Sequence, residues 1–133
     1  MENPMRPNDL EKSAVEKVLA DTSVKPTKKS IRWDAISIKS RSLTGAGFLT
    51  EFEPSPELKV FADGVSLRWG KVGARLNVRR TETGYLVYVD GGQITAVEGY
   101  TYGDEWPNEV DSIEWYELKE GSELENPPKL DLA

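Results

Sequence analysis

Five carboxylates crowd one short stretch late in the chain, and carboxylate oxygens are the ligands that Ca²⁺ and Mg²⁺ prefer in proteins. They belong to Asp104, Glu105, Glu109, Asp111 and Glu114. An EF-hand beginning at Asp104 needs glycine where Glu109 stands and a bidentate glutamate where Trp115 stands, so the spacing excludes that motif. We interpret the stretch as a solvated acidic loop, and an irregular cation site is the alternative.

Carboxylates are also the only groups here with a plausible route to catalysis. A pair such as Glu98 and Asp104 could supply the acid and the base of glycoside hydrolysis, which needs two carboxyl groups at a defined separation. The chain has no histidine and no cysteine, which removes the commonest general base, thiol nucleophiles, thiolate zinc sites and disulfides. We predict no catalytic residue, no metal ligand and no cofactor. A carboxylate enzyme or small-ligand binder that depends on a divalent cation is the alternative.

The densest candidate for a binding surface combines rings with charge: Tyr100, Tyr102, Asp104, Glu105 and Trp106. Large amphipathic rings give contact area at low entropic cost, and such residues dominate the energetics of many interfaces. We therefore predict a non-enzymatic binding module, of the immunity or inhibitor type, that presents an acidic aromatic face to a basic protein. In the alternative arrangement the rings fold back to seal the open end of the sheet, and only the carboxylates are exposed.

The charge of the chain is strongly asymmetric. Residues 1–97 contain 15 Lys and Arg against 12 Asp and Glu, whereas residues 98–133 contain 2 against 11. An acidic segment of this kind favours a basic partner. Arg75, Arg79 and Arg80 form a basic cluster that could contact single-stranded RNA, but the net charge of −6 argues against nucleic acid.

The length and composition are those of one globular domain. A chain of 133 residues can bury one core. No apolar run approaches the roughly 18 residues that span a bilayer, and no signal-peptide pattern begins the chain, so we expect a cytoplasmic protein with no membrane contact. The expected organisation is a flexible lead-in (1–7), a single domain (8–119) and a solvated acidic tail (120–133). No oligomeric state is predicted.

A helix is expected after the lead-in and before Pro26. Asn8 and Glu11 have the spacing of a capping box. Apolar residues recur with the helical period at Leu10, Ala14, Val15, Val18 and Leu19. The opposite side would carry Glu11, Lys12, Glu16 and Lys17.

Seven short runs rich in β-branched and aromatic residues follow, as expected for strands. They are 33–38, 47–52, 65–69, 72–79, 85–90, 94–100 and 112–118. Asp90, Gly91, Gly92 and Gln93 predict a tight hairpin between residues 85–89 and 94–98, and residues 85–89 should be central because both of their faces are apolar. The connections are too short for crossover helices. We predict an α+β fold in which the N-terminal helix packs on a mainly antiparallel sheet, or half-open barrel, of about six to seven strands.

Two segments carry a resemblance. Residues 40–52 contain Gly45, Ala46, Gly47 and Phe48, which begin like a dinucleotide fingerprint but lack the third glycine and the following helix, so we expect a tight bend between strands. With residues 97–107, this segment resembles a group of small uncharacterised bacterial proteins that share Ser-Arg-x-x-Thr-Gly-x-Gly-Phe and Glu-Gly-Tyr-Thr-Tyr-Gly motifs. The resemblance implies a bacterial origin and a common site for the two segments, and it implies no reaction.

Overall fold

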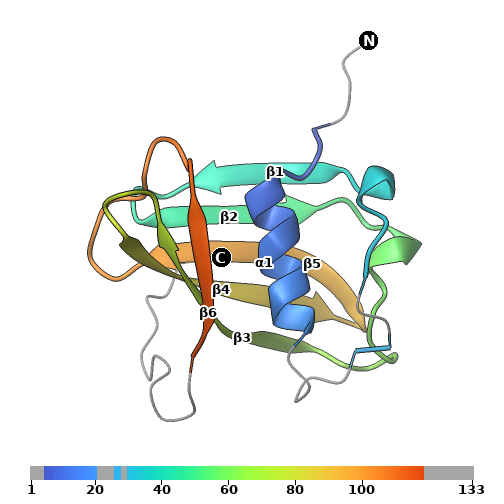
Figure 1. The fold of residues 1–133 in the computed structure, drawn as a ribbon. Coiled ribbons are helices and arrows are strands. Elements are labelled where there is room, and N and C mark those ends of the chain that lie inside the picture. Colours follow the sequence, from blue (N-terminus) through green and yellow to red (C-terminus); the bar gives the residue numbers. More distant parts are fainter. Residues whose placement is uncertain (1–4, 21–25, 28–29, 119–133) are drawn as a thin grey trace.

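The structure is a computed structural model that describes residues 5–20, 26–27 and 30–118. Its elements, in chain order, are α1 (Asp9–Leu19), η1 (Trp33–Ala35), β1 (Ile38–Leu43), β2 (Gly47–Phe52), η2 (Pro56–Leu58), β3 (Leu67–Leu76), β4 (Thr81–Asp90), β5 (Gln93–Thr101) and β6 (Ile113–Glu117). The six strands form one antiparallel sheet in the order β1-β2-β5-β4-β3-β6, and α1 crosses one face of it (Figure 1). This confirms the predicted α+β architecture. The expected tail, 120–133, lies outside the described residues.

The predicted start of α1 is confirmed. The Asn8 side chain accepts a hydrogen bond of 2.8 Å from the Glu11 backbone N–H, and the Glu11 carboxylate accepts one of 2.8 Å from the Asn8 N–H. The buried stripe of the helix, however, is Glu11, Ala14, Val15, Val18 and Leu19. The expectation that Glu11 lies on the outer side is therefore wrong, and the reason is an ion pair with a distant strand, described below.

The predicted hairpin is also confirmed. β4 pairs with β5, and Asp90 lies opposite Gln93. Gly91 and Gly92 have φ values of +60° and +82°, the left-handed conformation that a two-residue hairpin turn requires. β4 and β5 are the two central strands, in agreement with the apolar character of both faces of residues 85–89.

Two strand predictions are wrong. Runs 65–69 and 72–79 are not separate strands, because the single bulged strand β3 joins them, with a register shift between Trp69 and Val72. Residues 33–38 were expected to form a strand, but Trp33 lies in a 3₁₀ turn and β1 begins only at Ile38. The Trp33 ring packs against the Phe52 ring, with 6.2 Å between the ring centroids. The Trp33 indole N–H donates a hydrogen bond of 2.9 Å to the Glu16 carboxylate. These tertiary contacts outweigh the local preference for a strand.

The core lies between α1 and the sheet. The helix packs against β3, β4 and β5, and its buried residues meet the rings and branched side chains of the facing strands. Residues 5–7, from the expected lead-in, also contact this body: the Arg6 guanidinium donates to the carbonyl oxygens of Asp34 and Ile36. Within the described part of the chain, no helix is long and apolar enough to cross a membrane.

Candidate functional site at one end of the sheet

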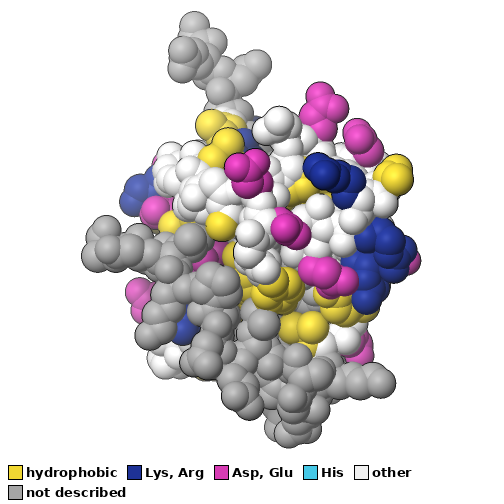
Figure 2. Space-filling model, turned by 90° about the vertical axis from the view of Figure 1, so that its left-hand side faces the viewer, with side chains coloured by type: hydrophobic (Ala, Val, Ile, Leu, Met, Phe, Trp, Pro, Cys, Tyr) yellow, Lys and Arg dark blue, Asp and Glu magenta, His cyan; other side chains and the backbone are white. Residues whose placement is uncertain are grey.

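Three connections gather at one end of the sheet, on the left in Figure 1: the β1–β2 turn (44–46), the β3–β4 turn (77–80) and the β5–β6 loop (102–112). The strand register brings them together, because Gly47 lies opposite Tyr100 and Leu76 lies opposite Ile113. We call this region the loop end. Figure 2 looks onto it: hydrophobic side chains gather in the middle, Asp and Glu lie around them, and Lys and Arg gather at one side.

The β5–β6 loop is held in place by hydrogen bonds to both neighbouring turns. The Trp106 N–H donates to the Gly45 carbonyl at 2.8 Å. The Asn77 amide donates to the Glu109 carbonyl at 2.8 Å, and its oxygen accepts from the Asp111 N–H at 2.7 Å. Asn77 has φ +66°, a left-handed conformation that asparagine adopts more readily than most residues. The loop is thus positioned mainly through its backbone, and its charged side chains are exposed to solvent.

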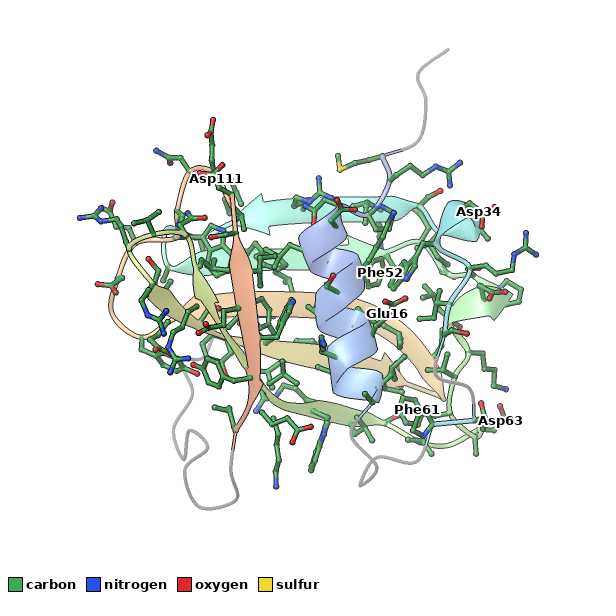
Figure 3. The ribbon with its side chains drawn as sticks, viewed as in Figure 1. Glu16, Asp34, Phe52, Phe61, Asp63 and Asp111 are labelled. Atoms are coloured by element: carbon green, nitrogen blue, oxygen red, sulfur yellow. The ribbon has the colours of Figure 1, made fainter. Side chains whose placement is uncertain are left out.

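Four carboxylates of this loop point into solvent: Asp104, Glu105, Glu109 and Asp111. None of them forms an ion pair within the part of the chain that the structure describes. Asp111 lies at the loop end, whereas Asp34 and Asp63 lie at the opposite end of the molecule (Figure 3). Two arginines are nearby on the β3–β4 turn, where Arg80 pairs with Glu114 at 3.2 Å and Arg79 is exposed. The loop therefore carries a local excess of negative charge.

Trp106 belongs to the core rather than to the exposed surface. Its ring meets Phe48 edge to face at a centroid distance of 5.2 Å, and it meets Tyr85 at 6.4 Å with an interplanar angle of 83°. Trp115 also packs on Tyr85, with a distance of 5.0 Å between the ring centroids. These rings close the open end of the core on the face of the sheet that α1 covers.

Tyr100 and Tyr102 lie on the opposite face of the sheet. A Cβ atom on Gly84 would meet the hydroxyl groups of both tyrosines. A Cβ atom on Gly99, which precedes Tyr100 in β5, would instead meet the rings of Phe48 and Tyr85. Because adjacent strand residues point to opposite faces, the two pairs of rings occupy different faces of the sheet. Tyr100 is buried, and Tyr102 is 37% exposed. The structure thus divides the predicted set of five residues: Asp104 and Glu105 stay together on the exposed loop, and the three rings are distributed over two faces.

A pocket of about 580 Å³ opens at the loop end, in the seam between the first and last strands of the open sheet. We call it the seam pocket. Its walls come from the first turn of α1, the β1–β2 hairpin, the β5–β6 loop and the start of β6. The lining residues are Asn8, Asp9, Leu10, Glu11, Arg41, Leu43, Gly45, Gly47, Phe48, Trp106, Pro107, Asn108, Val110 and Ile113.

The polar wall of the seam pocket is an ion pair that was not predicted from the sequence. The Glu11 side chain is 1% exposed, and its two oxygens accept hydrogen bonds of 2.7 Å from Nε and Nη2 of Arg41. The Thr50 hydroxyl donates to the same carboxylate. Bonding to Glu11 raises the pKa of the Arg41 guanidinium, so Arg41 stays charged. One feature of the sequence indicates that Glu11 is buried. Glu11 lies three residues before Ala14 and four before Val15, so it falls on the same side of the helix as these apolar residues.

The opposite face of the sheet holds a second buried carboxylate, Glu98, which is 1% exposed. Its Oε1 accepts a hydrogen bond from the Tyr88 hydroxyl, and its Oε2 has no partner within the described residues. Burial raises the pKa of Glu98, and the Tyr88 hydrogen bond and the charge of Arg68 oppose this shift. Because Glu98 is buried in a strand and Asp104 is exposed on the loop, the pair considered for glycoside hydrolysis is split between different environments.

Two of the three arginines in the basic cluster, Arg75 and Arg80, form ion pairs with acidic residues. Arg75 bonds Glu82 at 2.7 Å and Glu114 at 3.1 Å, and it lies 4.5 Å from the centre of the Tyr116 ring. Glu114 also forms an ion pair with Arg80.

Among the described residues, no group of three or more acidic side chains is arranged to hold a metal ion.

The two segments that carry the sequence resemblance, 40–52 and 97–107, are neighbours in the fold. β2 pairs with β5, and the β1–β2 turn bonds the β5–β6 loop through Gly45 and Trp106. Together they supply much of the seam pocket and half of the exposed acidic residues of the loop. No protein-family model, curated protein or solved structure matches this chain at a significant level.

Proposed function

We propose that this protein is a non-enzymatic binding module, of the immunity or inhibitor type, that recognises a basic protein in the cytoplasm of a bacterium through its β5–β6 loop. The observation that carries the proposal is the set of four exposed carboxylates at Asp104, Glu105, Glu109 and Asp111, which have no ion-pair partner among the described residues. The hydrogen bonds to Gly45 and Asn77 hold this loop in one arrangement. A pre-positioned loop loses less conformational entropy on binding than a loose one.

Charge of this kind acts mainly on the rate of encounter. Complementary potentials steer two proteins together and accelerate association, and salt weakens the effect. Arg79 lies near the loop and reduces the negative potential locally, but the four carboxylates outnumber it. We therefore expect a partner surface rich in Lys and Arg, an association rate that falls with ionic strength, and a complex whose lifetime depends on further contacts.

The test begins with capture of partners from the source organism and purification of the captured protein. Association of that purified partner is then measured for the native protein and for the double variant Asp104→Lys/Glu105→Lys. We expect the double variant to associate about tenfold more slowly or worse at low salt, and the difference to shrink at high salt.

The matched control is Glu53→Lys/Asp34→Lys, which reverses two exposed charges at the end of the sheet away from the loop. At about 0.1 M salt it should leave the association rate within about twofold of the native value, because screening at that ionic strength limits the reach of a surface charge to about 10 Å. Equal rates for the native protein and the Asp104→Lys/Glu105→Lys variant, or rates that do not respond to salt, would reject the proposal.

A further inference from the structure

We infer that the seam pocket receives a bulky apolar side chain from a Lys- or Arg-rich segment of the partner. The inference rests on the proposed function, because it assigns the apolar half of recognition to the pocket and leaves the electrostatic half to the acidic loop. It adds a second site and states what kind of segment fits both.

The β5–β6 loop supplies both parts of the recognition surface. Trp106, Pro107, Asn108 and Val110 line the pocket, and the exposed acids alternate with them along the same chain at Glu105, Glu109 and Asp111. Consecutive Cα atoms are 3.8 Å apart. A side chain that enters the pocket therefore brings its own chain neighbours within reach of these carboxylates.

The charges around the pocket favour a basic segment over an acidic one. Arg41 is the one Lys or Arg among the lining residues, all of which the structure describes, and both of its bonds to carboxylate go to Glu11. Asp9 adds an exposed carboxylate at the rim. An anionic occupant would meet no uncommitted cation on these walls, whereas Lys or Arg side chains beside the anchor would meet several acids.

The pocket is large enough for a bulky side chain, and its surroundings favour a protein segment. A volume of about 580 Å³ lies within the roughly 300–1,000 Å³ usual for small-molecule clefts. Leu43 lines the pocket and is also 76% exposed, so apolar surface continues outward from the opening. A chain segment whose anchor enters the pocket would cover Leu43, and a central buried anchor is where binding energy usually concentrates.

The probes are three capped pentapeptides, Lys-Lys-Phe-Lys-Lys, Lys-Lys-Ser-Lys-Lys and Glu-Glu-Phe-Glu-Glu, titrated into ¹⁵N-labelled full-length protein. We expect the first to bind at least about tenfold more tightly than either of the others, because only it combines an anchor with positive charge. Its shift changes should centre on the Trp106 indole N–H and on the backbone amides of Leu43 and Val110.

Two surface variants distinguish peptide binding at the seam pocket from nonspecific hydrophobic binding elsewhere on the surface. Leu43→Ser removes an apolar lining side chain, and Val78→Ser removes one that is 96% exposed at the same end of the molecule but does not line the pocket. Neither side chain supports the core, so both variants should fold. We expect Leu43→Ser to weaken binding of Lys-Lys-Phe-Lys-Lys about fivefold or more, and Val78→Ser to leave it unchanged.

The outcomes distinguish the two proposals. If the phenylalanine and serine peptides bind equally and Leu43→Ser has no effect, while Asp104→Lys/Glu105→Lys still slows the natural partner, the pocket inference fails and the acidic-loop function stands. If the anchor effect is present but charge reversal leaves the partner's rate unchanged, the proposed function fails. No shift change at about 10 mM peptide, where even very weak binding is visible, overturns the pocket inference.

Discussion

The Glu11 carboxylate and the Arg41 guanidinium form two hydrogen bonds of 2.7 Å across 30 residues of sequence. Glu11 takes part at the same time in the capping box of α1, through its bond to the Asn8 N–H. One buried side chain thus closes the first turn of the helix and attaches that turn to β1. The ion pair fixes the position of the wall that α1 contributes to the seam pocket.

Replacing Glu11 should cost far more stability than losing a helix cap. Glu11→Ala leaves Arg41 without its acid and removes half of the capping box, and we expect it to lower the free energy of unfolding by about 3 kcal/mol. Asn8→Ala removes only the cap and should cost about 1 kcal/mol. Urea unfolding of both variants measures the difference. Equal losses would mean that the ion pair contributes nothing beyond the cap.

The buried carboxyl of Glu98 should make the protein less stable as the pH rises. Burial raises its pKa above the ordinary value of 4.5, so the folded state keeps a proton that the unfolded state has already released. The folded state then binds more protons, and the free energy of unfolding falls between the ordinary pKa and the raised one. Glu98→Gln, which cannot ionise, should not lose stability in this window and should be at least as stable as the native protein at neutral pH.

The control for this prediction is Tyr88→Phe. Tyr88 donates a hydrogen bond to Glu98, and this bond lowers the pKa of the carboxyl. Its loss should widen the pH window in which stability falls. Unfolding in urea between about pH 4 and 8 gives all three profiles, and a Glu98→Gln profile parallel to the native one would show that another group titrates.

The rings near the loop end should differ in their effect on stability. Trp106→Ala removes a ring that packs on Phe48 and Tyr85, and because Trp106 is half-buried we expect a loss of about 2–3 kcal/mol. Tyr102→Ala changes a partly exposed side chain and should cost about 1 kcal/mol or less. Thermal or urea unfolding tests this order, and a costlier Tyr102 variant would contradict the division of rings between core and surface.

A glycine in the β1–β2 turn, Gly45, and the first residue of β2, Gly47, should respond differently to replacement by alanine. A Cβ atom on Gly47 would lie 2.0 Å from the Gly99 carbonyl oxygen, so β2 and β5 would have to separate, and we expect a loss of about 3 kcal/mol or more. A Cβ on Gly45 would meet nothing within 4 Å, and only its φ of +82° opposes the change, at about 1–2 kcal/mol. Unfolding measurements that show Gly45→Ala as the costlier variant would contradict this account.

Features decided between near neighbours in the chain could be predicted. The capping box of Asn8 and Glu11 spans three residues, and the hairpin turn depends on two adjacent glycines that adopt positive φ. The short connections also exclude crossover helices, which makes the sheet antiparallel. The acidic loop was predictable as a loop because it has no apolar period and contains Gly103 and Pro107.

Features decided by distant partners could not be predicted. Nothing near Glu11 in the sequence indicates that Arg41 neutralises it, and nothing near Trp33 indicates that Phe52 and Glu16 hold its ring in a 3₁₀ turn. The three rings of the predicted surface are close in sequence but lie on two faces, because side chains alternate along β5 and the loop then turns Trp106 toward the core.

The amino-acid sequence by itself determined the class of fold, the start of the helix, the central hairpin and the position of the acidic loop, since each depends on backbone preferences within a few residues. Only the tertiary structure decided that Trp106 closes the core, that Tyr100 and Tyr102 face the other side, and that a pocket opens between α1, β1 and β6. Those features depend on strand register and on the packing of residues far apart in the chain, where a shift of one position moves a side chain to the opposite face.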